Sequence, residues 1–335
     1  MDTIGFDTNL YISAQVQQIE DMLRRPCDKF YMEIGGKLMQ DRHASRVLPG
    51  YHEDARFKIV KELGLIGDIL IAVSAKDIVR GRIRGDFKIT YDKETLRTIE
   101  ELRQRGLRVK YVVITMFDPA MEGQDLISSF EDELKKNDIS VFRFFASDNH
   151  RSSIFSAEDL EKNPYVDFSS RMVSIIAPGG GSGKFGVCLS QLYHEMKRGI
   201  APRYFSLGAF PIYELPSDNP VNLAYLAATA DLHDSLKKDP HTPESLVTER
   251  EIENFIILNQ LANHFGEEGR YLREIKSATD MCISSLSRGI VNAEVVQREA
   301  AAEIARRYIR YKFEYERGEE AKETVDRARQ ILLML

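Results

Sequence analysis

The sequence has few cysteines, no long apolar run and no excess of positive charge. Its three cysteines, Cys27, Cys188 and Cys282, lie far apart without a CxxC pair, which excludes a disulfide framework and a zinc site of usual spacing. No apolar stretch is long enough to cross a membrane, and the N-terminus lacks the basic and apolar regions of a signal peptide. A general nucleic-acid binder is usually basic, whereas this chain has a net charge of −6. We therefore expect a cytoplasmic protein with no nucleic-acid or membrane partner.

The length and the hydrophobic pattern predict two domains. The chain has 335 residues, 43% hydrophobic and 29% charged, a composition typical of soluble globular proteins. From about residue 29 to residue 215, apolar segments of strand length alternate with helical patterns, which is typical of βαβ units. We predict an α/β fold with a mostly parallel, doubly wound, P-loop-like or Rossmann-like sheet, followed by a helical domain. The predicted domains are 1–215 and 216–335, and the second is expected to contain no strands.

The predicted elements follow from apolar periodicity and from glycine and proline positions. The predicted strands are residues 30–34, 68–75, 109–115, 139–145, 172–177 and 204–210. The predicted helices of the second part are residues 221–236, 243–265, 272–288, 293–317 and 319–335.

The segment APGGGSGK (177–184) is the most informative part of the chain. It joins an apolar run to an amphipathic helix and contains Gly179, Gly180, Gly181, Ser182, Gly183 and Lys184. Glycines let backbone N–H groups converge, the helix N-terminus adds partial positive charge, and a lysine at a helix start can reach a phosphate. We predict that these residues bind the phosphate of a small phosphorylated ligand, with Lys184 exposed at the helix start.

The motif departs from the Walker A pattern in two places. Pro178 stands where the first glycine belongs, and Phe185 stands where a Mg²⁺-binding hydroxyl belongs. No apolar strand closed by an acid supplies a clear Walker B element. The alternative interpretation is a glycine-rich turn that serves close packing alone.

Polar loops after other predicted strands add candidate residues. Ligands bind beyond the carboxyl ends of strands in an open parallel sheet, which selects His43 and Arg46 after the first strand and Arg84 and Asp86 after the second. We predict that Arg46 and Arg84 contact phosphate and that His43 and Asp86 act as catalytic groups, all around one pocket with Lys184. The alternatives are a structural histidine and an extended surface segment in which the alternating residues Arg80, Arg82 and Arg84 face only water.

Two acids near residue 230 are candidates for metal binding. Asp231 and Asp234 are three residues apart on the predicted helix 221–236 and would share a face. Asp231 is also a candidate catalytic residue. If Mg²⁺ is the cofactor, these acids would replace the hydroxyl that is missing at Phe185; a solvated acidic face is the alternative.

Several motifs together resemble a known family. HASRVLPG (43–50), RGDFKITYD (84–92), APGGGSGK (177–184), CLSQLYHEMKRGI (188–200) and PVNLAYLAATADL (220–232) resemble a bacterial family of uncharacterised proteins that carry a domain of unknown function. The resemblance spans essentially the whole chain and implies a P-loop-like α/β core beside a helical domain. Family members are longer, with a further α/β portion, so this chain is expected to be a shortened form.

Three classes of function remain open. An enzyme would transfer or hydrolyse a phosphoryl group, which requires mainly positioning and charge neutralisation. A binding or regulatory protein would hold the ligand unchanged, as Phe185 and the missing Walker B acid favour. A third class is an assembly protein, in which the long helices form a homo-oligomer interface.

Overall fold

The computed structural model describes residues 4–63, 67–84, 87–107, 109–145, 155–208 and 210–335. Within these residues, seven strands form one parallel sheet in the order β11-β8-β1-β7-β2-β5-β6. The strands of this sheet are β1 Lys29–Ile34, β2 Asp68–Ser74, β5 Val109–Phe117, β6 Ser140–Phe145, β7 Met172–Ile176, β8 Pro202–Leu207 and β11 Cys282–Ile283. The α/β class and the parallel sheet are therefore confirmed.

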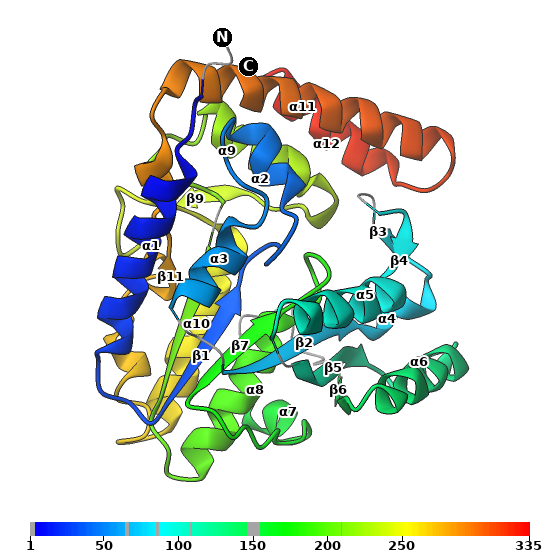
Figure 1. Ribbon diagram of the computed structural model, residues 1–335, viewed down its shortest axis with the longest axis vertical. Coiled ribbons are helices and arrows are strands. Elements are labelled where there is room, and N and C mark those ends of the chain that lie inside the picture. Colours follow the sequence, from blue (N-terminus) through cyan, green and yellow to red (C-terminus); the bar gives the residue numbers. More distant parts are fainter. Residues whose placement is uncertain (1–3, 64–66, 85–86, 108, 146–154, 209) are drawn as a thin grey trace.

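Helices cover both faces of the sheet (Figure 1). The central strands β2 and β7 are buried along their whole length, which explains why they read as continuous apolar runs. The helices are α1 Thr8–Leu23, α2 Arg42–Val47, α3 Ala55–Glu62, α4 Ala75–Val79, α5 Tyr91–Gln104, α6 Gln124–Lys136, α7 Ala157–Glu161, α8 Lys184–Lys197, α9 Pro220–Ala228, α10 Glu249–His264, α11 Ala293–Glu316 and α12 Lys322–Leu332.

Side chains alternate between two cores. In β1, Phe30 and Met32 point into a core shared with α1, α3, α5 and α11, whereas Tyr31 points into a core shared with α8 and α10. This alternation follows from the two-residue period of a strand. Because α3 and α8 lie in different cores, the connections that leave β1 and β7 cross opposite faces of the sheet.

The second half of the chain departs from the predicted run of helices. Short hairpin strands β9 Leu236–Lys238 and β10 Leu246–Thr248 precede α10, and β11 joins the large sheet beside β8. The expected helix over residues 272–288 is wrong, because this segment forms short 3₁₀ turns around β11. Its apolar residues reach the sheet edge as a two-residue strand, which is too short to show a period of two.

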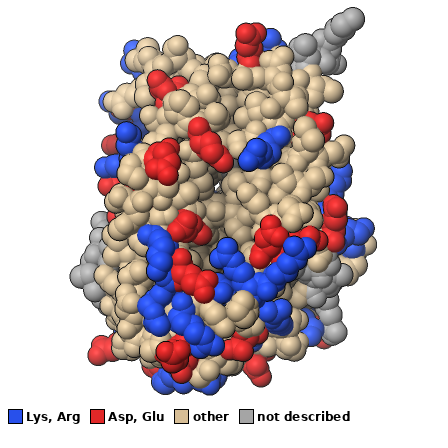
Figure 2. Space-filling model, turned by 90° about the vertical axis from the view of Figure 1, so that its left-hand side faces the viewer, with Lys and Arg blue, Asp and Glu red and all other residues tan. Residues whose placement is uncertain are grey.

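The surface around α1 carries mixed charge. Figure 2 views the molecule from the α1 side and shows Lys and Arg gathered over the lower half, interspersed with Asp and Glu. At the end of α1, Arg24 pairs with Glu20 and Asp21, and Arg25 pairs with Glu274. Positive charge on this face is therefore partly neutralised by neighbouring acids.

One buried amide holds the segment after β8. The Asn222 side chain accepts a hydrogen bond from the Ile212 N–H at 2.9 Å and donates to the carbonyls of Ile212, Leu215 and Pro216 at 3.1–3.2 Å. We expect Asn222→Ala to lower the free energy of unfolding by about 2 kcal/mol, since it leaves buried backbone groups without partners. Urea denaturation checks this value. Asn263→Ala on the exposed side of α10 serves as the control, and equal losses in the two variants would contradict the prediction.

Candidate functional site

The glycine-rich loop joins β7 to α8 as the sequence predicts. β7 ends at Ile176, and α8 begins at Lys184 with Gly183 as its N-cap. Gly181 and Gly183 have φ values of 72° and 78°, a left-handed conformation that glycine adopts without strain. The strand, the turn and the helix of the motif are therefore confirmed.

Packing explains some of the glycines. A Cβ atom on Gly179 would lie 2.4 Å from the Tyr91 hydroxyl oxygen, and one on Gly183 would lie 3.0 Å from Thr115 Oγ1. Thr115 also donates a hydrogen bond of 2.7 Å to the Ser182 carbonyl. The Ser182 hydroxyl donates to the Gly179 carbonyl at 3.0 Å, so it holds the loop in shape.

The loop keeps backbone donors unused. Within the described part of the chain, the N–H groups of Gly180, Gly181 and Gly183 have no hydrogen-bond acceptor. The first N–H groups of a helix also lack partners within the helix and carry partial positive charge. The loop thus brings together donors of the kind that bind an anion.

The loop lies at the switch point of the sheet. β1 and β7 are neighbours, and their following connections run over opposite faces, α3 in one core and α8 in the other. Open α/β sheets bind ligands outside the carboxyl ends of two such strands. Here that position lies between the loop after β1 and the glycine-rich loop.

Lys184 is buried, contrary to the expectation that it is exposed at the helix start. Its side chain is 8% exposed, and its Nζ atom lies 3.7 Å from Glu33 Oε1 at the end of β1. At that distance the pair is an ionic contact without a hydrogen bond. The Tyr204 hydroxyl donates to Glu33 Oε2 at 3.1 Å, and burial together with the Glu33 charge raises the pKa of Tyr204 well above its ordinary value. Sequence spacing gave no signal for Glu33 or Tyr204, because both partners come from other strands.

A buried arginine fixes the loop after β1. Arg56 of α3 donates to the carbonyls of Gly35 and Lys37 and pairs with Asp41 Oδ2 at 2.8 Å. The guanidinium carries five donors in a planar fork, which lets one side chain bind two carbonyls and a carboxylate. Arg56 therefore sets the course of the chain beside the glycine-rich loop.

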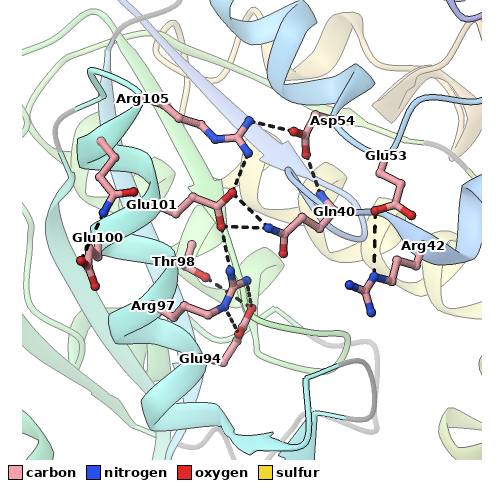
Figure 3. Close-up of polar contacts among 11 residues, drawn as sticks. Gln40, Arg42, Glu53, Asp54, Glu94, Arg97, Thr98, Glu100, Glu101 and Arg105 are labelled. Carbon is pink, nitrogen blue, oxygen red and sulfur yellow. Dashed lines mark hydrogen bonds and ion pairs between the residues drawn. The ribbon is translucent and has the colours of Figure 1, made fainter.

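A polar network ties the same segment to α5. Figure 3 shows Gln40 reaching Glu101, which also accepts from Arg97 and Arg105, while Arg105 contacts Asp54. The Gln40 N–H donates to Asp54 at 2.9 Å. The loop after β1 is thus held from both α3 and α5.

His43 and Arg46 lie on α2 and contact α11. Arg46 Nε donates to Glu303 Oε2 at 2.9 Å, and His43 Nδ1 lies 3.5 Å from Glu303 Oε1. No contact within the described residues joins either side chain to Lys184. No sequence pattern predicts the contacts of His43 and Arg46 with Glu303, because Glu303 lies far away along the chain.

The loop after β2 places Arg82, rather than the predicted Arg84, near the glycine-rich loop. Arg84 belongs to the short strand β3 Ile83–Arg84, paired with β4 Ile89–Thr90, and Asp86 lies outside the described residues. Arg82 instead reaches the area of the glycine-rich loop: it contacts Asp231 at 3.0 Å and lies over the Tyr91 ring. The sequence predicted a cationic loop after the second strand but selected Arg84 rather than Arg82.

Asp231 and Asp234 do not share a helix face, so that prediction is wrong. α9 ends at Ala228, a 3₁₀ turn Ala230–Leu232 follows, and His233 has a φ value of 57°. Asp231 contacts Arg82, whereas Asp234 accepts from Tyr225 and Arg250 at 2.7 and 2.9 Å. Across the residues that the structure describes, no three His, Cys, Asp or Glu side chains gather as a metal site.

Two cavities lie near this edge of the sheet. One, of about 270 Å³, is lined by residues of α4, α5 and α6, including Ile78, Lys93 and Phe130. The other, of about 20 Å³, is lined by Lys37 and Ala177 among residues of the β1 loop, α5 and the end of β7. Neither is lined by Lys184, His43 or Arg46, so neither is the predicted common pocket.

The fold and the loop define an α/β protein with a glycine-rich strand-to-helix turn at the switch point of a parallel sheet. The chain belongs to the family described as "Domain of unknown function DUF1846, N-terminal", whose model matches residues 4–335. This membership confirms the family that the sequence motifs resemble.

Two similar proteins from clostridia illustrate the extent of the match. A UPF0371 protein of Clostridium tetani (strain Massachusetts / E88) is 40% identical over 338 residues, which cover 98% of this chain and 66% of that protein. A UPF0371 protein of Clostridium botulinum (strain Alaska E43 / Type E3) is 39% identical with the same coverage. The chain thus spans 66% of the length of these relatives. Among the described helices, none is long and apolar enough to cross a membrane.

Proposed function

We propose that the glycine-rich loop, residues 179–183, binds the phosphoryl group of a nucleotide or another phosphorylated small molecule. The observation that carries this proposal is the group of unpaired N–H groups beside a buried lysine. Gly180, Gly181 and Gly183 have no acceptor within the described residues, and the ammonium of Lys184 lies only 3.7 Å from Glu33 without hydrogen bonding to it. A phosphate oxygen would satisfy both kinds of donor.

Binding requires one side chain to move. A Cβ atom on Gly180 or Gly181 would lie 3.3 or 3.7 Å from the Leu232 methyl groups, so Leu232 covers this part of the loop. Leu232 belongs to the 3₁₀ turn that also carries Asp231, and Asp231 pairs with Arg82. A phosphorylated ligand would displace Leu232 and bring its negative charge near Arg82.

The residues favour binding over Mg²⁺-dependent hydrolysis of the P-loop type. Phe185 packs edge-on against Tyr204 with ring centroids 5.8 Å apart, and a phenyl ring cannot ligate a metal. A phosphoryl-transfer or hydrolase activity stays the enzymatic alternative. Phosphorus NMR of ATP incubated with the protein and Mg²⁺ separates the two: an enzyme consumes the nucleotide, whereas a regulatory protein returns it unchanged.

Replacement of Lys184 tests the site directly. We expect Lys184→Met to weaken binding of pyrophosphate and ATP about tenfold or more, since a charge-assisted contact is lost while the apolar stem is kept. Isothermal titration calorimetry measures the affinity. Lys197→Met, at the exposed opposite end of α8 where Lys197 pairs with Glu161, is the matched control and should bind like the wild type.

A double variant separates ligand binding from stability. Lys184→Met alone leaves the partly exposed Glu33 carboxylate without its cation and should lower the free energy of unfolding by about 1–3 kcal/mol, the cost of a polar group left without a partner. Adding Glu33→Gln removes the unpaired charge and should recover much of that loss, but not the affinity. If the double variant recovers pyrophosphate binding, or if the wild type binds neither probe, the loop is a packing turn and the proposal is wrong.

A further inference from the structure

Three arginines from two helices surround a single buried glutamate at the contact of α2 with α11. Glu303 is 2% exposed and accepts from Arg46 Nε at 2.9 Å, Arg306 Nε at 2.8 Å and Arg307 Nε at 3.0 Å. We call these four residues and His43 the Glu303 cluster. It lies apart from the contacts of Lys184.

The Glu303 cluster carries an excess of positive charge. Burial alone would raise the pKa of Glu303, but the contact with His43, the hydrogen bond from Arg306 and the charges of Arg307 and Arg46 hold this pKa well below its ordinary value. The carboxylate is therefore ionised at neutral pH and neutralises only one of three guanidinium groups. Two positive charges remain uncompensated within the cluster.

The donors of the cluster are only partly used. Each arginine contacts Glu303 through Nε, and within the described residues the Nη groups of Arg46 and Arg306 make no hydrogen bond. Arg307 directs one Nη atom to His43 Nδ1 at 3.4 Å. A guanidinium binds oxyanions best through its paired N–H groups, and those groups are the ones left open.

In the described part of the chain, the ring of His43 contains a buried nitrogen without a hydrogen-bond partner, which is independent evidence for a bound group at this site. Its Nε2 atom is buried and has no hydrogen-bond partner among the described residues, and its ring packs edge-on against Phe210. Burial lowers the pKa of His43, although the neighbouring Glu303 carboxylate opposes that shift. Buried polar atoms in native proteins are nearly always paired, so this nitrogen indicates a group that the protein chain does not supply.

We propose that the Glu303 cluster binds a phosphate dianion, as free phosphate or as a phosphomonoester, at a site distinct from the glycine-rich loop. A dianion matches the two uncompensated charges, whereas a carboxylate would neutralise only one. Its oxygens would accept from the open Nη groups of Arg46 and Arg306 and occupy the unpartnered side of His43. Solvent reaches the two arginines, whose side chains are 33% and 48% exposed, whereas the His43 side chain is 16% exposed and its Nε2 atom must be uncovered when the phosphate binds.

Inorganic phosphate is the probe, and the nitrogen resonances of the His43 ring are the reporter. We expect a saturable shift of the His43 Nε2 signal at constant pH and ionic strength, with acetate producing a much weaker effect. Arg46→Gln and Arg306→Gln should each weaken phosphate binding at this reporter about tenfold. Arg298→Gln, an exposed arginine on the same helix, should leave the affinity unchanged.

The same reporter separates this site from the glycine-rich loop. Lys184→Met should leave the phosphate-dependent shift of His43 intact even if pyrophosphate binding at the loop is lost. The proposal is overturned if phosphate produces no saturable shift in the folded wild type, or if acetate produces an equal one. It is also overturned if Arg306→Gln, folded by circular dichroism, binds phosphate as tightly as the control.

Discussion

Arg56→Met should lower the free energy of unfolding by about 3–5 kcal/mol, because it removes one partner of a buried ion pair. Arg56 is 2% exposed at its side chain and pairs with Asp41, which is itself buried. The substitution also strips donors from the carbonyls of Gly35 and Lys37. Methionine keeps the length of the stem, so the loss reports the missing charge and hydrogen bonds. Urea denaturation followed by circular dichroism gives the value.

Two further variants calibrate this result. Asp41→Asn in the Arg56→Met background removes the stranded carboxylate and should recover part of the stability. Arg105→Met breaks partly exposed pairs with Asp54 and Glu101 and should cost about 1 kcal/mol or less, as pairs near the surface do. If Arg56→Met loses no more free energy of unfolding than Arg105→Met, the buried contacts of Arg56 add nothing to stability and the prediction is wrong.

Glu303→Gln should lower the free energy of unfolding by about 3 kcal/mol at pH 7, since it leaves three guanidinium groups without a counter-charge. The loss should depend on pH. Because the folded-state pKa of Glu303 lies below its ordinary value of 4.5, the stabilisation by the carboxylate is complete above pH 4.5 and decreases as the pH falls toward the folded-state pKa. The difference in the free energy of unfolding between wild type and variant should therefore become smaller below pH 4.5.

Denaturation at pH 7 and at pH 3 measures that difference. Glu299→Gln, on the same helix and paired with its exposed neighbour Arg298, should differ little from the wild type at either pH. If Glu303→Gln loses the same free energy of unfolding at both pH values, the stabilisation does not come from an ionised Glu303 paired with its arginines, and the prediction is wrong.

The sequence predicted the elements whose signals are local. α8 begins at Lys184 as the sequence predicts, because an apolar stripe, a glycine N-cap and a basic last turn lie within one short segment. The alternation of apolar runs also predicted the six long strands β1, β2, β5, β6, β7 and β8, but not the short elements α2, α4, β3, β4 and α7. The sequence did not predict β11, because a strand of two residues is too short to show alternation of apolar and polar side chains. It did not predict the end of α9 either, because no proline or glycine marks the left-handed turn at His233.

The partners of the site residues could not be predicted in this way. Lys184 meets Glu33, and His43 meets Glu303, only after the sheet and the α2–α11 contact have formed. Spacing along a chain reports neighbours on one helix or strand, not side chains that long-range packing brings together. The motif therefore identified the loop correctly but placed its lysine in solvent rather than beside a carboxylate.

The position of β7 in the sheet has a consequence for synthesis on the ribosome. Its register pairs Met172 with Phe30 on one side and Val173 with Asp68 on the other, so β1 and β2 have no common neighbour until residue 176 has left the exit tunnel. β2, β5 and β6 can pair in order of translation, while β1 waits with an unsatisfied edge. The nascent chain thus passes through a long interval in which an apolar strand with unpaired edges is exposed, and such a strand is prone to aggregation until β7 is made.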